Sequence, residues 1–526
     1  MQLSRLFATA ITILGVQAKL QSKEDYLKNI APSELDRLSK YEASHKDLNL
    51  SQKAALNLIK SAVTNFATDE QDSTEKVCNV AFGEAECKSI LFGGQPSAST
   101  SSTRRSGLKK RVGSCTCTVS SDYCGNGLVC KNLPGECAPA GANGLGAGNQ
   151  ARTWIPGNAK IRGVNLGSQF IIEPWMAQDE FSSMGCGGLN DEWQCVEHLG
   201  QDAADQAFKK HWDTWTTQDD IKQIASLGLN TIRIPVGFWL KEDLVKDGEH
   251  YPRGGVEYLD RLVGWCKDNN IYVIMDLHGG PGSQFPNQQY TGHGVSEAGF
   301  YNQDNYERAA KFLEWMAERI HTNETYKTVG MLEVLNEPVH AGDHASEAAD
   351  MIHTFYPLAW NRIRDRESKL GIKDEDRLHI QFMGNAWGSG DPTSALPSTD
   401  FAAFDDHRYY KWDGSVSKSK DGYINAACND KREDGVIIGE WSISVADDVE
   451  SNDEFGIRGR TDQADWYKKF WAAQVQAFEK SAGWVFWTWK CNWIGGFDEW
   501  RWCYKSAVAA GAIPKDAGSA GDIHPC

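Results

Sequence analysis

From residue 153 to residue 526, short apolar runs alternate with longer stretches in which apolar residues recur every three or four positions. The short runs are typical of buried β-strands, and the longer spacing is typical of amphipathic α-helices. An α/β fold of alternating strands and helices favours a (β/α)8 TIM barrel with loop insertions. An open doubly wound sheet is the alternative, but no Gly-x-Gly-x-x-Gly turn follows the first strand. Eight runs are predicted as strands, at residues 161–167, 231–237, 272–279, 329–338, 378–385, 401–410, 435–442 and 483–490.

Two of the intervening helices have recognisable first turns. Thr217 and Asp220 have the spacing of a capping box, and Gly228 is suited to end that helix in the left-handed conformation. Asp304 is predicted to cap a second helix, with its apolar side chains on one face.

The N-terminal residues have the pattern of a secretory signal peptide. Arg5 precedes an apolar run at residues 6–16, and Ala18 is a suitable cleavage position, so residues 1–18 are predicted to be removed. The run is too short to anchor the chain in a bilayer, and no other stretch of the sequence is long and apolar enough. We therefore expect a secreted protein, either free or associated with the cell wall.

Between the signal peptide and residue 153 the sequence predicts three further segments. Residues 19–111 are charged, helix-favouring and then rich in Ser and Thr, and they end in basic clusters. They form either a propeptide that a dibasic-cutting protease removes or a linker that stays attached. Residues 112–138 hold five cysteines without a histidine, which favours disulfides over zinc in an oxidising compartment. Residues 139–152 form a Gly/Ala-rich linker.

Composition narrows the class of partner. The formal net charge of -17 argues against nucleic acid and against anionic membranes, and leaves a neutral polymer open. The 20 Trp and 16 Tyr residues suit stacking on sugars, although most of them could equally fill the core. Fourteen cysteines in a secreted chain predict disulfides, and the even number permits full pairing.

Two predicted strands deliver a glutamate in the same way. Residues 331–338 read Met-Leu-Glu-Val-Leu-Asn-Glu-Pro, and residues 435–442 read Gly-Val-Ile-Ile-Gly-Glu-Trp-Ser. Glu337 and Glu440 therefore emerge where strands end, and a pair of carboxyl groups is what glycoside hydrolysis requires. We predict that Glu337 is a protonated acid/base and Glu440 an ionised nucleophile. With the two strands roughly opposite each other in the barrel, the carboxyl groups would lie about 5 to 5.5 Å apart, as retention of configuration needs.

Further polar and aromatic residues fall at the predicted strand ends, where barrel enzymes gather their reacting groups. Arg233 and Tyr409 are expected to hold Glu440 ionised, and Asn336 to bind the sugar 2-hydroxyl. Trp487 offers a face beneath the sugar. Taken alone, any one of these residues could be a buried structural group. The complete set of predicted substrate-binding residues is Arg233, His278, Asn336, His407, Tyr409 and Trp487.

These residues resemble glycoside hydrolase family 5, a family of retaining β-glycanases in the cellulase-like superfamily. The resemblance covers residues 161–503 and rests on several stretches taken together, namely 161–167, 173–175, 277–284, 405–409, 439–441 and 486–490. It implies that the two glutamates and the six substrate-binding residues named above occupy the site positions of that family. Residues 1–150 lie outside the resemblance.

Within this family the sequence is similar to the fungal β-glucanase branch. An insertion after the first strand, at residues 183–195, resembles that of endo-1,6-β-glucanases, which implies a glucan endo-1,6-β-glucosidase. Exo-acting 1,3-β-glucosidases of the same family are the alternative. Cys186 and Cys195 could close the insertion with a disulfide.

Two other classes of function compete with the hydrolase. Metal-dependent hydrolysis would use His278 and His407, but no His-Glu-x-x-His spacing is present, so we expect neither a metal nor a cofactor. A non-catalytic glucan-binding wall protein would not need both glutamates. We therefore expect a monomeric enzyme whose partner is a β-glucan polysaccharide.

Overall fold

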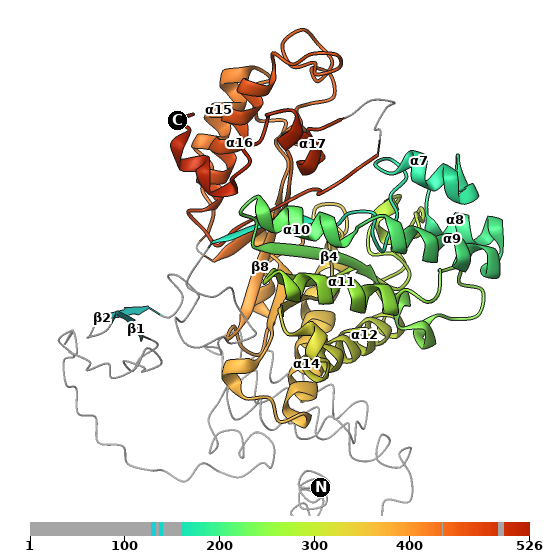
Figure 1. Cartoon of the computed structure of the whole chain (residues 1–526). Coiled ribbons are helices and arrows are strands. Elements are labelled where there is room, and N and C mark those ends of the chain that lie inside the picture. The colour runs from blue at the N-terminus through green and yellow to red at the C-terminus, as the bar shows by residue number, and fades with distance from the viewer. Residues whose placement is uncertain (1–127, 133–135, 140–159, 434, 493–498) are drawn as a thin grey trace, which may run out of the picture. The chain divides into compact units, whose positions relative to one another are not determined.

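The computed structural model describes residues 128–132, 136–139, 160–433, 435–492 and 499–526 (Figure 1). The predicted signal peptide, the segment at residues 19–111, residues 140–152 of the predicted linker and much of the cysteine-rich segment lie outside the described residues. Within the cysteine-rich segment, β1 (Leu128–Asn132) pairs antiparallel with β2 (Glu136–Pro139), and Cys130 is opposite Cys137 in the register.

Eight parallel strands close into a barrel, which confirms the predicted fold. The barrel closes where the last strand pairs with the first, with Gly483 opposite Ile161. The strands are β3 (Ile161–Asn165), β4 (Thr231–Gly237), β5 (Tyr272–Gly279), β6 (Val329–Glu333), β7 (His379–Met383), β8 (Ala402–Arg408), β9 (Val436–Trp441) and β10 (Gly483–Phe486).

The order of the strands agrees with the predicted placement of the two glutamates. In the closed sheet, β7 and β8 separate β6 from β9 on one side, and four strands separate them on the other. The strand that leads to Glu337, β6, and the strand that holds Glu440, β9, therefore lie roughly opposite each other, as predicted.

Helices cover the outside of the barrel, as Figure 1 shows for α10, α11, α12 and α14. In the described connection from β7 to β8, only short 3-10 turns replace the helix, at Asn385–Trp387 and Pro392–Ser394. The α-helices are α7 (Gln178–Phe181), α8 (Glu192–Leu199), α9 (Gln201–Thr214), α10 (Gln218–Ser226), α11 (Val256–Asp268), α12 (Gln303–Thr322), α13 (Ala345–Asp350), α14 (Tyr356–Lys369), α15 (Lys420–Cys428), α16 (Ala464–Phe478) and α17 (Tyr504–Ala509).

The two predicted helix starts had different outcomes. The capping box of α10 is confirmed, because the Thr217 hydroxyl accepts from the Asp220 amide and the Asp220 carboxylate accepts from the Thr217 amide. The predicted capping residue of α12, Asp304, is wrong, because the Asn302 side chain caps the helix and accepts from the Asn305 amide. Asp304 lies in the first turn instead, where the helix dipole favours its charge and Lys246 pairs with it.

The interior of the barrel changes character along the strands. A lower layer is apolar and includes Ile274 of β5 and Met331 of β6. Two residues further along the same strands, on the same face, lie the buried carboxyls of Asp276 and Glu333. Strand periodicity thus places a polar layer directly above an apolar plug, at the end of the barrel where the predicted site residues emerge.

Three disulfides link described cysteines. Cys186–Cys195 closes the insertion as predicted, and the other two are Cys428–Cys526 and Cys491–Cys503. The full pairing that the even number permits is not reached, because Cys266 is a free thiol buried in α11. Of the helices that the structure describes, none combines the length and the apolar character needed to cross a bilayer.

Candidate active site

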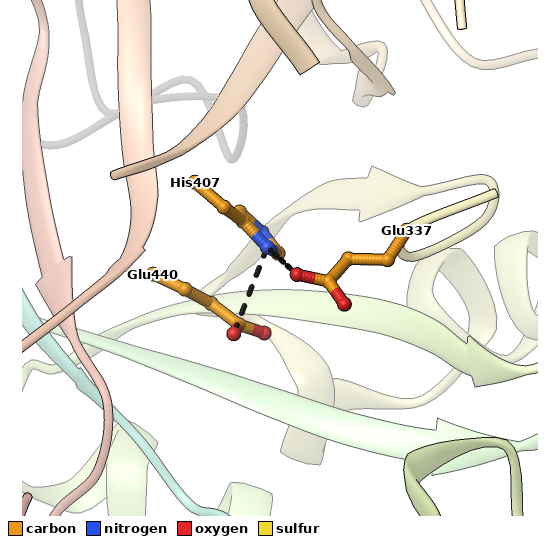
Figure 2. A group of neighbouring side chains, drawn as sticks. All are labelled: Glu337, His407 and Glu440. Carbon is orange, nitrogen blue, oxygen red and sulfur yellow. Dashed lines mark hydrogen bonds and ion pairs between the residues drawn. The ribbon is translucent and has the colours of Figure 1, made fainter. Parts of the chain in front are cut away.

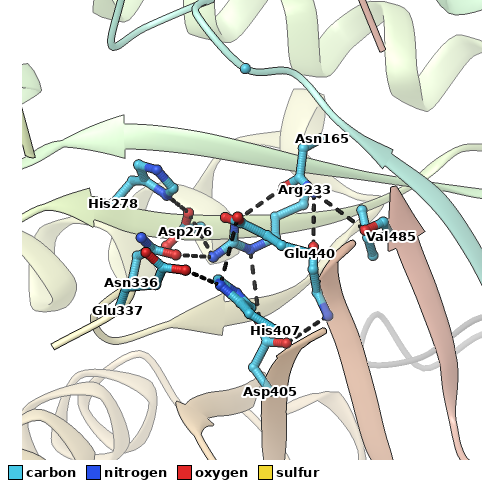
Figure 3. A network of polar contacts seen from close by, with 12 residues as sticks. Asn165, Arg233, Asp276, His278, Asn336, Glu337, Asp405, His407, Glu440 and Val485 are labelled. Atoms are coloured by element: carbon cyan, nitrogen blue, oxygen red, sulfur yellow. Dashed lines mark hydrogen bonds and ion pairs between the residues drawn. The ribbon is translucent and has the colours of Figure 1, made fainter. Parts of the chain in front are cut away.

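Arg233 is the centre of a buried polar network at the carboxyl ends of the strands (Figure 3). It extends from β4, and its guanidinium donates to Glu440 Oε1 at 3.0 Å and to Asn336 Oδ1 at 2.8 Å. It also donates to Glu333 Oε2 at 2.8 Å and pairs with Asp276 Oδ2 at 3.0 Å. Because the planar fork donates in several fixed directions, one arginine orients groups from three other strands or strand ends.

Glu440 is built into the regular strand β9, and only 6% of its side chain is exposed. Its Oε1 accepts from Arg233, and its Oε2 accepts from the Tyr409 hydroxyl at 2.7 Å. Both carboxylate oxygens are therefore held by donors on neighbouring elements, so the side chain has one fixed orientation.

Glu337 is built differently. It follows β6 by four residues and has a φ of 37°, in the left-handed region that side chains other than glycine seldom adopt. This turn of the chain, directly before Pro338, directs the carboxyl group into the barrel mouth. Its Oε1 accepts from His407 Nδ1 at 2.6 Å, and the Tyr290 hydroxyl donates to its backbone carbonyl at 3.3 Å.

His407 lies between the two glutamates (Figure 2). Its Nδ1 is 2.6 Å from Glu337 Oε1 and 3.6 Å from Glu440 Oε2. The ring nitrogen and one oxygen of each glutamate all lie within 4.8 Å of one another. The two carboxyl groups thus have the close approach of a retaining pair rather than the wider spacing, about 6.5 to 9.5 Å, of an inverting pair.

The same three residues could offer ligand atoms to a metal ion. The Nδ1 atom of His407 is engaged with Glu337, however, and the Arg233 guanidinium is 3.0 Å from Glu440. A positive charge beside one ligand and a hydrogen bond on another oppose a bound cation. The arrangement is better suited to holding and moving a proton.

The buried charges act differently on the two glutamates. Burial raises the pKa of Glu440, together with the charge of Glu337, although His407 and Arg233 act in the opposite direction. Burial would also raise the pKa of Glu337, but the hydrogen bond and charge of His407 outweigh burial and lower that pKa. Burial disfavours the imidazolium of His407, yet the surrounding carboxylates raise its pKa well above the ordinary value. His407 thus favours the carboxylate form of Glu337, the glutamate predicted to be protonated, and itself holds a proton beside it.

The remaining predicted residues also converge on this site. His278 Nδ1 is 2.7 Å from Asp276 Oδ2, and its ring stacks on Trp487 with the centroids 5.5 Å apart. Among the described residues, neither His278 Nε2 nor Asn336 Nδ2 has a protein partner, although both are buried. Both nitrogens are therefore available to a bound molecule. All eight predicted residues lie in one connected group at the barrel mouth.

Glu173 belongs to the same site and received no role in the sequence analysis. It follows β3, it is 5% exposed, and its Oε2 accepts from Trp175 Nε1 at 2.9 Å. Burial raises the pKa of Glu173 to about 8, although the Trp175 hydrogen bond lowers it. The sequence did contain a signal for Glu173. The tripeptide Glu-Pro-Trp at residues 173–175 places a carboxyl group after a predicted strand, as the sequence around Glu337 does.

A row of aromatic rings begins at Tyr409 beside Glu440, and Trp412 within this row reaches the solvent. Tyr409 is 5.0 Å from Trp412, Trp412 is 5.8 Å from Trp502, and Trp502 is 5.3 Å from Trp175, measured between ring centroids. Trp412 is 62% exposed, and in the part of the chain that the structure describes it is the one large hydrophobic side chain that is mainly exposed. The sequence contains many aromatic residues, so spacing alone did not single out this row.

Comparison with known proteins gives matches to the same part of the chain. The family described as "Cellulase (glycosyl hydrolase family 5)" matches residues 196–492. The chain is 52% identical to "Glucan endo-1,6-beta-glucosidase B" of Emericella nidulans over 379 residues, which cover 72% of this chain and 90% of that protein. It is 49% identical to "Probable glucan endo-1,6-beta-glucosidase B" of Aspergillus terreus, over 72% of this chain and 92% of that protein.

Among solved structures, the fold is similar to "Crystal structure of rutinosidase from Aspergillus niger". The TM-score is 0.53, the sequence identity is 20%, and the match covers 69% of this chain and 99% of that one. At this identity the likeness concerns the barrel fold alone.

Proposed function

This chain belongs to glycosyl hydrolase family 5, and from that premise we propose that it is a retaining endo-1,6-β-glucanase that uses Glu337 as acid/base and Glu440 as nucleophile. The observation that carries the proposal is the approach of one oxygen of each glutamate and Nδ1 of His407 to within 4.8 Å of one another. One sugar ring can then meet both carboxyl groups at once.

In the first step, a Glu440 oxygen attacks the anomeric carbon while the bond to the leaving oxygen breaks. A covalent glycosyl-enzyme forms, and the leaving oxygen takes a proton from Glu337. His407, whose pKa the surrounding carboxylates raise, holds that proton before the reaction. The 2.6 Å hydrogen bond from its Nδ1 to Glu337 Oε1 gives the proton a direct path to Glu337 when the leaving oxygen arrives.

In the second step, Glu337 takes a proton from water, and the water oxygen attacks the anomeric carbon. The bond to Glu440 breaks, so two inversions give net retention. Arg233 and the Tyr409 hydroxyl stabilise the Glu440 carboxylate as it leaves, because both donate hydrogen bonds to its oxygens. Asn336 Nδ2 and His278 Nε2 are free to bind sugar hydroxyl groups.

The 1,6 linkage rests on two observations. The similar proteins from Emericella nidulans and Aspergillus terreus carry that specificity in their names. The insertion closed by Cys186–Cys195 lies between β3 and β4, and its contacts extend to a loop that borders the site. We propose that the catalytic domain comprises residues 153–526. We also propose that the protein is secreted, with or without removal of residues 19–111, and then cleaves the glucan of the cell wall.

The experiment incubates the purified secreted protein with pustulan (1,6-linked), laminarin (1,3-linked) and carboxymethylcellulose, and then measures the size of the products. We expect a ladder of short oligosaccharides from pustulan and little release from the other two. Glucose released mainly from laminarin would overturn the linkage and favour an exo-1,3-glucosidase. NMR of the first products should show the β-anomer, and an α-anomer would overturn retention. Sequencing of the secreted N-terminus locates the processing site.

A further inference from the structure

The disulfide-closed insertion between β3 and β4 is a compact unit. It comprises α7, the turn at Ser182–Cys186 and α8, and Figure 1 shows α8 beside α9. Both cysteines of the Cys186–Cys195 disulfide are fully buried. Glu192 anchors the unit to the chain after β3, where its carboxylate accepts from the Ile172 amide at 2.8 Å.

The insertion binds the β5–α12 loop (residues 280–302) at three consecutive residues. The Trp193 amide donates to the Gly292 carbonyl at 3.0 Å, and the Gly294 amide donates to Asp191 Oδ2 at 2.9 Å. Between these bonds the Trp193 ring stacks on the His293 ring, with centroids 3.8 Å apart and planes 6° apart. Two hydrogen bonds and a stacked ring pair fix this stretch of loop in position and in orientation.

The fixed stretch begins two residues after Tyr290, which borders the catalytic pair. Its hydroxyl donates to the Glu337 carbonyl at 3.3 Å, and its ring packs edge-on against His278 with centroids 5.5 Å apart. On the other side of Tyr290, the Gln289 side chain accepts from the Trp175 amide at 3.3 Å. The loop is thus held on both sides of Tyr290.

Glu337 needs external support for its backbone. Its φ of 37° is in the left-handed region, which is unfavourable for a residue with a Cβ atom because the Cβ approaches the following carbonyl oxygen. A donor to the carbonyl of that residue helps to keep the peptide in this conformation. Any rotation of the backbone there would swing the carboxyl group away from the leaving oxygen.

We propose that Tyr290 is a positioning residue for proton transfer by Glu337, and that the insertion closed by Cys186–Cys195 holds Tyr290 in place. This inference rests on the proposed function of Glu337. It assigns to the insertion a part in the protonation step, in addition to any contact that it makes with the glucan.

The chemistry of the leaving group makes the proposal testable. A glucan leaves as an ordinary alcohol, whose oxygen must be protonated as the bond breaks. A 2,4-dinitrophenolate leaves without a proton, so a misplaced Glu337 slows only the first kind of substrate. The ratio of the two rates is also independent of how much folded enzyme is present.

The first test compares Tyr290→Phe with the wild type on a 1,6-linked gluco-oligosaccharide and on 2,4-dinitrophenyl β-gentiobioside. For the first substrate we expect kcat to fall about tenfold with KM within about twofold, and for the second we expect less than about a twofold loss in the glycosylation rate. Tyr326→Phe is the matched control, because that hydroxyl bonds to Asp260 at 2.7 Å on the outer side of the barrel. Equal losses on both substrates would overturn the positioning role.

The second test separates the insertion from disulfides in general. The double variant Cys186→Ser/Cys195→Ser should change the rate ratio in the same direction as Tyr290→Phe, by about three- to tenfold. The control Cys428→Ser/Cys526→Ser removes the disulfide between the C-terminal residue and α15 and should leave the ratio unchanged. A wild-type ratio in the insertion variant would overturn the coupling. Absence of any 1,6-cleavage by the wild type would instead overturn the proposed function.

Discussion

One carboxyl oxygen of Glu440 and one of Glu337 lie within 4.8 Å of each other, yet the two side chains are held in different ways. Glu440 belongs to a regular strand, and donors fix both of its oxygens. Glu337 lies beyond its strand on a left-handed backbone, and its carboxyl bonds to a histidine that itself titrates. The exposed fraction of the side chain is 14% for Glu337 and 6% for Glu440.

The contrast fits the roles that we propose for the two groups. A nucleophile forms a bond to one carbon and must keep its position and its charge, so a rigid strand and fixed donors suit it. An acid/base must lose and regain a proton at a leaving oxygen, so a partner that shares the proton and a more open position suit it. The pair is therefore asymmetric in structure before any substrate binds.

The largest effect should come from removing either carboxyl group. Glu440→Gln and Glu337→Gln should each lower kcat on 1,6-glucan by about a thousandfold or more. An aryl glycoside with a good leaving group should separate them, because it dispenses with the acid but not with the nucleophile. The measurement is the pre-steady-state rate on both substrates. If the two variants responded equally to the leaving group, the assigned roles would be wrong.

Arg233→Lys should produce the next largest effect, because an ammonium group cannot reproduce the fork that contacts Glu440, Asn336 and Glu333. We expect kcat/KM to fall about a hundredfold and stability to fall by about 2 kcal/mol, as buried carboxylates lose partners. Arg162→Lys is the control, since Arg162 pairs with Glu479 at 2.7 Å outside the site. The measurements are kcat/KM and the free energy of unfolding in urea for both variants. Equal losses in the two variants would contradict this prediction.

Tyr409→Phe should act on Glu440 alone. Loss of the 2.7 Å hydrogen bond from the hydroxyl disfavours the carboxylate and raises further a pKa that burial already raises. Activity depends on ionised Glu440, so the acidic limb of the kcat/KM profile should move upward by about one pH unit, with about a tenfold loss at the optimum. Tyr410→Phe is the control, because that hydroxyl donates to Asp430. An unmoved acidic limb would contradict the assignment of Glu440.

Glu173→Gln should have the smallest effect of the four changes, and the effect should be on thermal stability. It extends the comparison of Glu337 and Glu440 to a third carboxyl group of the site. Burial raises the pKa of Glu173 to about 8, so the folded state binds its proton more tightly than the unfolded state does. The resulting stability is complete below the ordinary glutamate pKa and is lost as the pH rises through about 8. Between about pH 5 and 8.5, the wild-type Tm should therefore fall a few degrees more than that of the variant. Parallel Tm curves would show that Glu173 does not hold this proton.

The barrel could be predicted because its strands are buried on both faces and read as apolar runs. The bounds of β4 and β5 match the prediction at both ends. The strand predicted at residues 329–338 ends earlier, at Glu333, because the chain leaves the sheet to place Asn336 and Glu337 over the barrel mouth. Val334 and Leu335 remain buried there, so apolar character continues beyond the ladder.

The composition of the site could also be predicted, but the position of His407 within it could not. Placing His407 between the glutamates depends on the stagger of β8 and β9, which shifts between Asp406 and His407. Tyr290 and Trp412 lie in single 3-10 turns, which are too short for a periodic pattern to mark the side chain that faces the site. Glu173 was visible as a carboxyl after a strand, but only its burial shows that it belongs with the other two.

The guanidinium of Arg233 and the hydroxyl of Tyr409 converge on the place that the Glu440 carboxylate fills. If that carboxylate were shortened to a small neutral side chain, the two donors would still point at the same spot and would bind an anion such as formate or fluoride. An α-glucosyl fluoride could then transfer its sugar to an acceptor, and the product could no longer be cleaved. The two donors that orient the Glu440 carboxylate would thus allow the same barrel to assemble β-linked oligosaccharides instead of cleaving them.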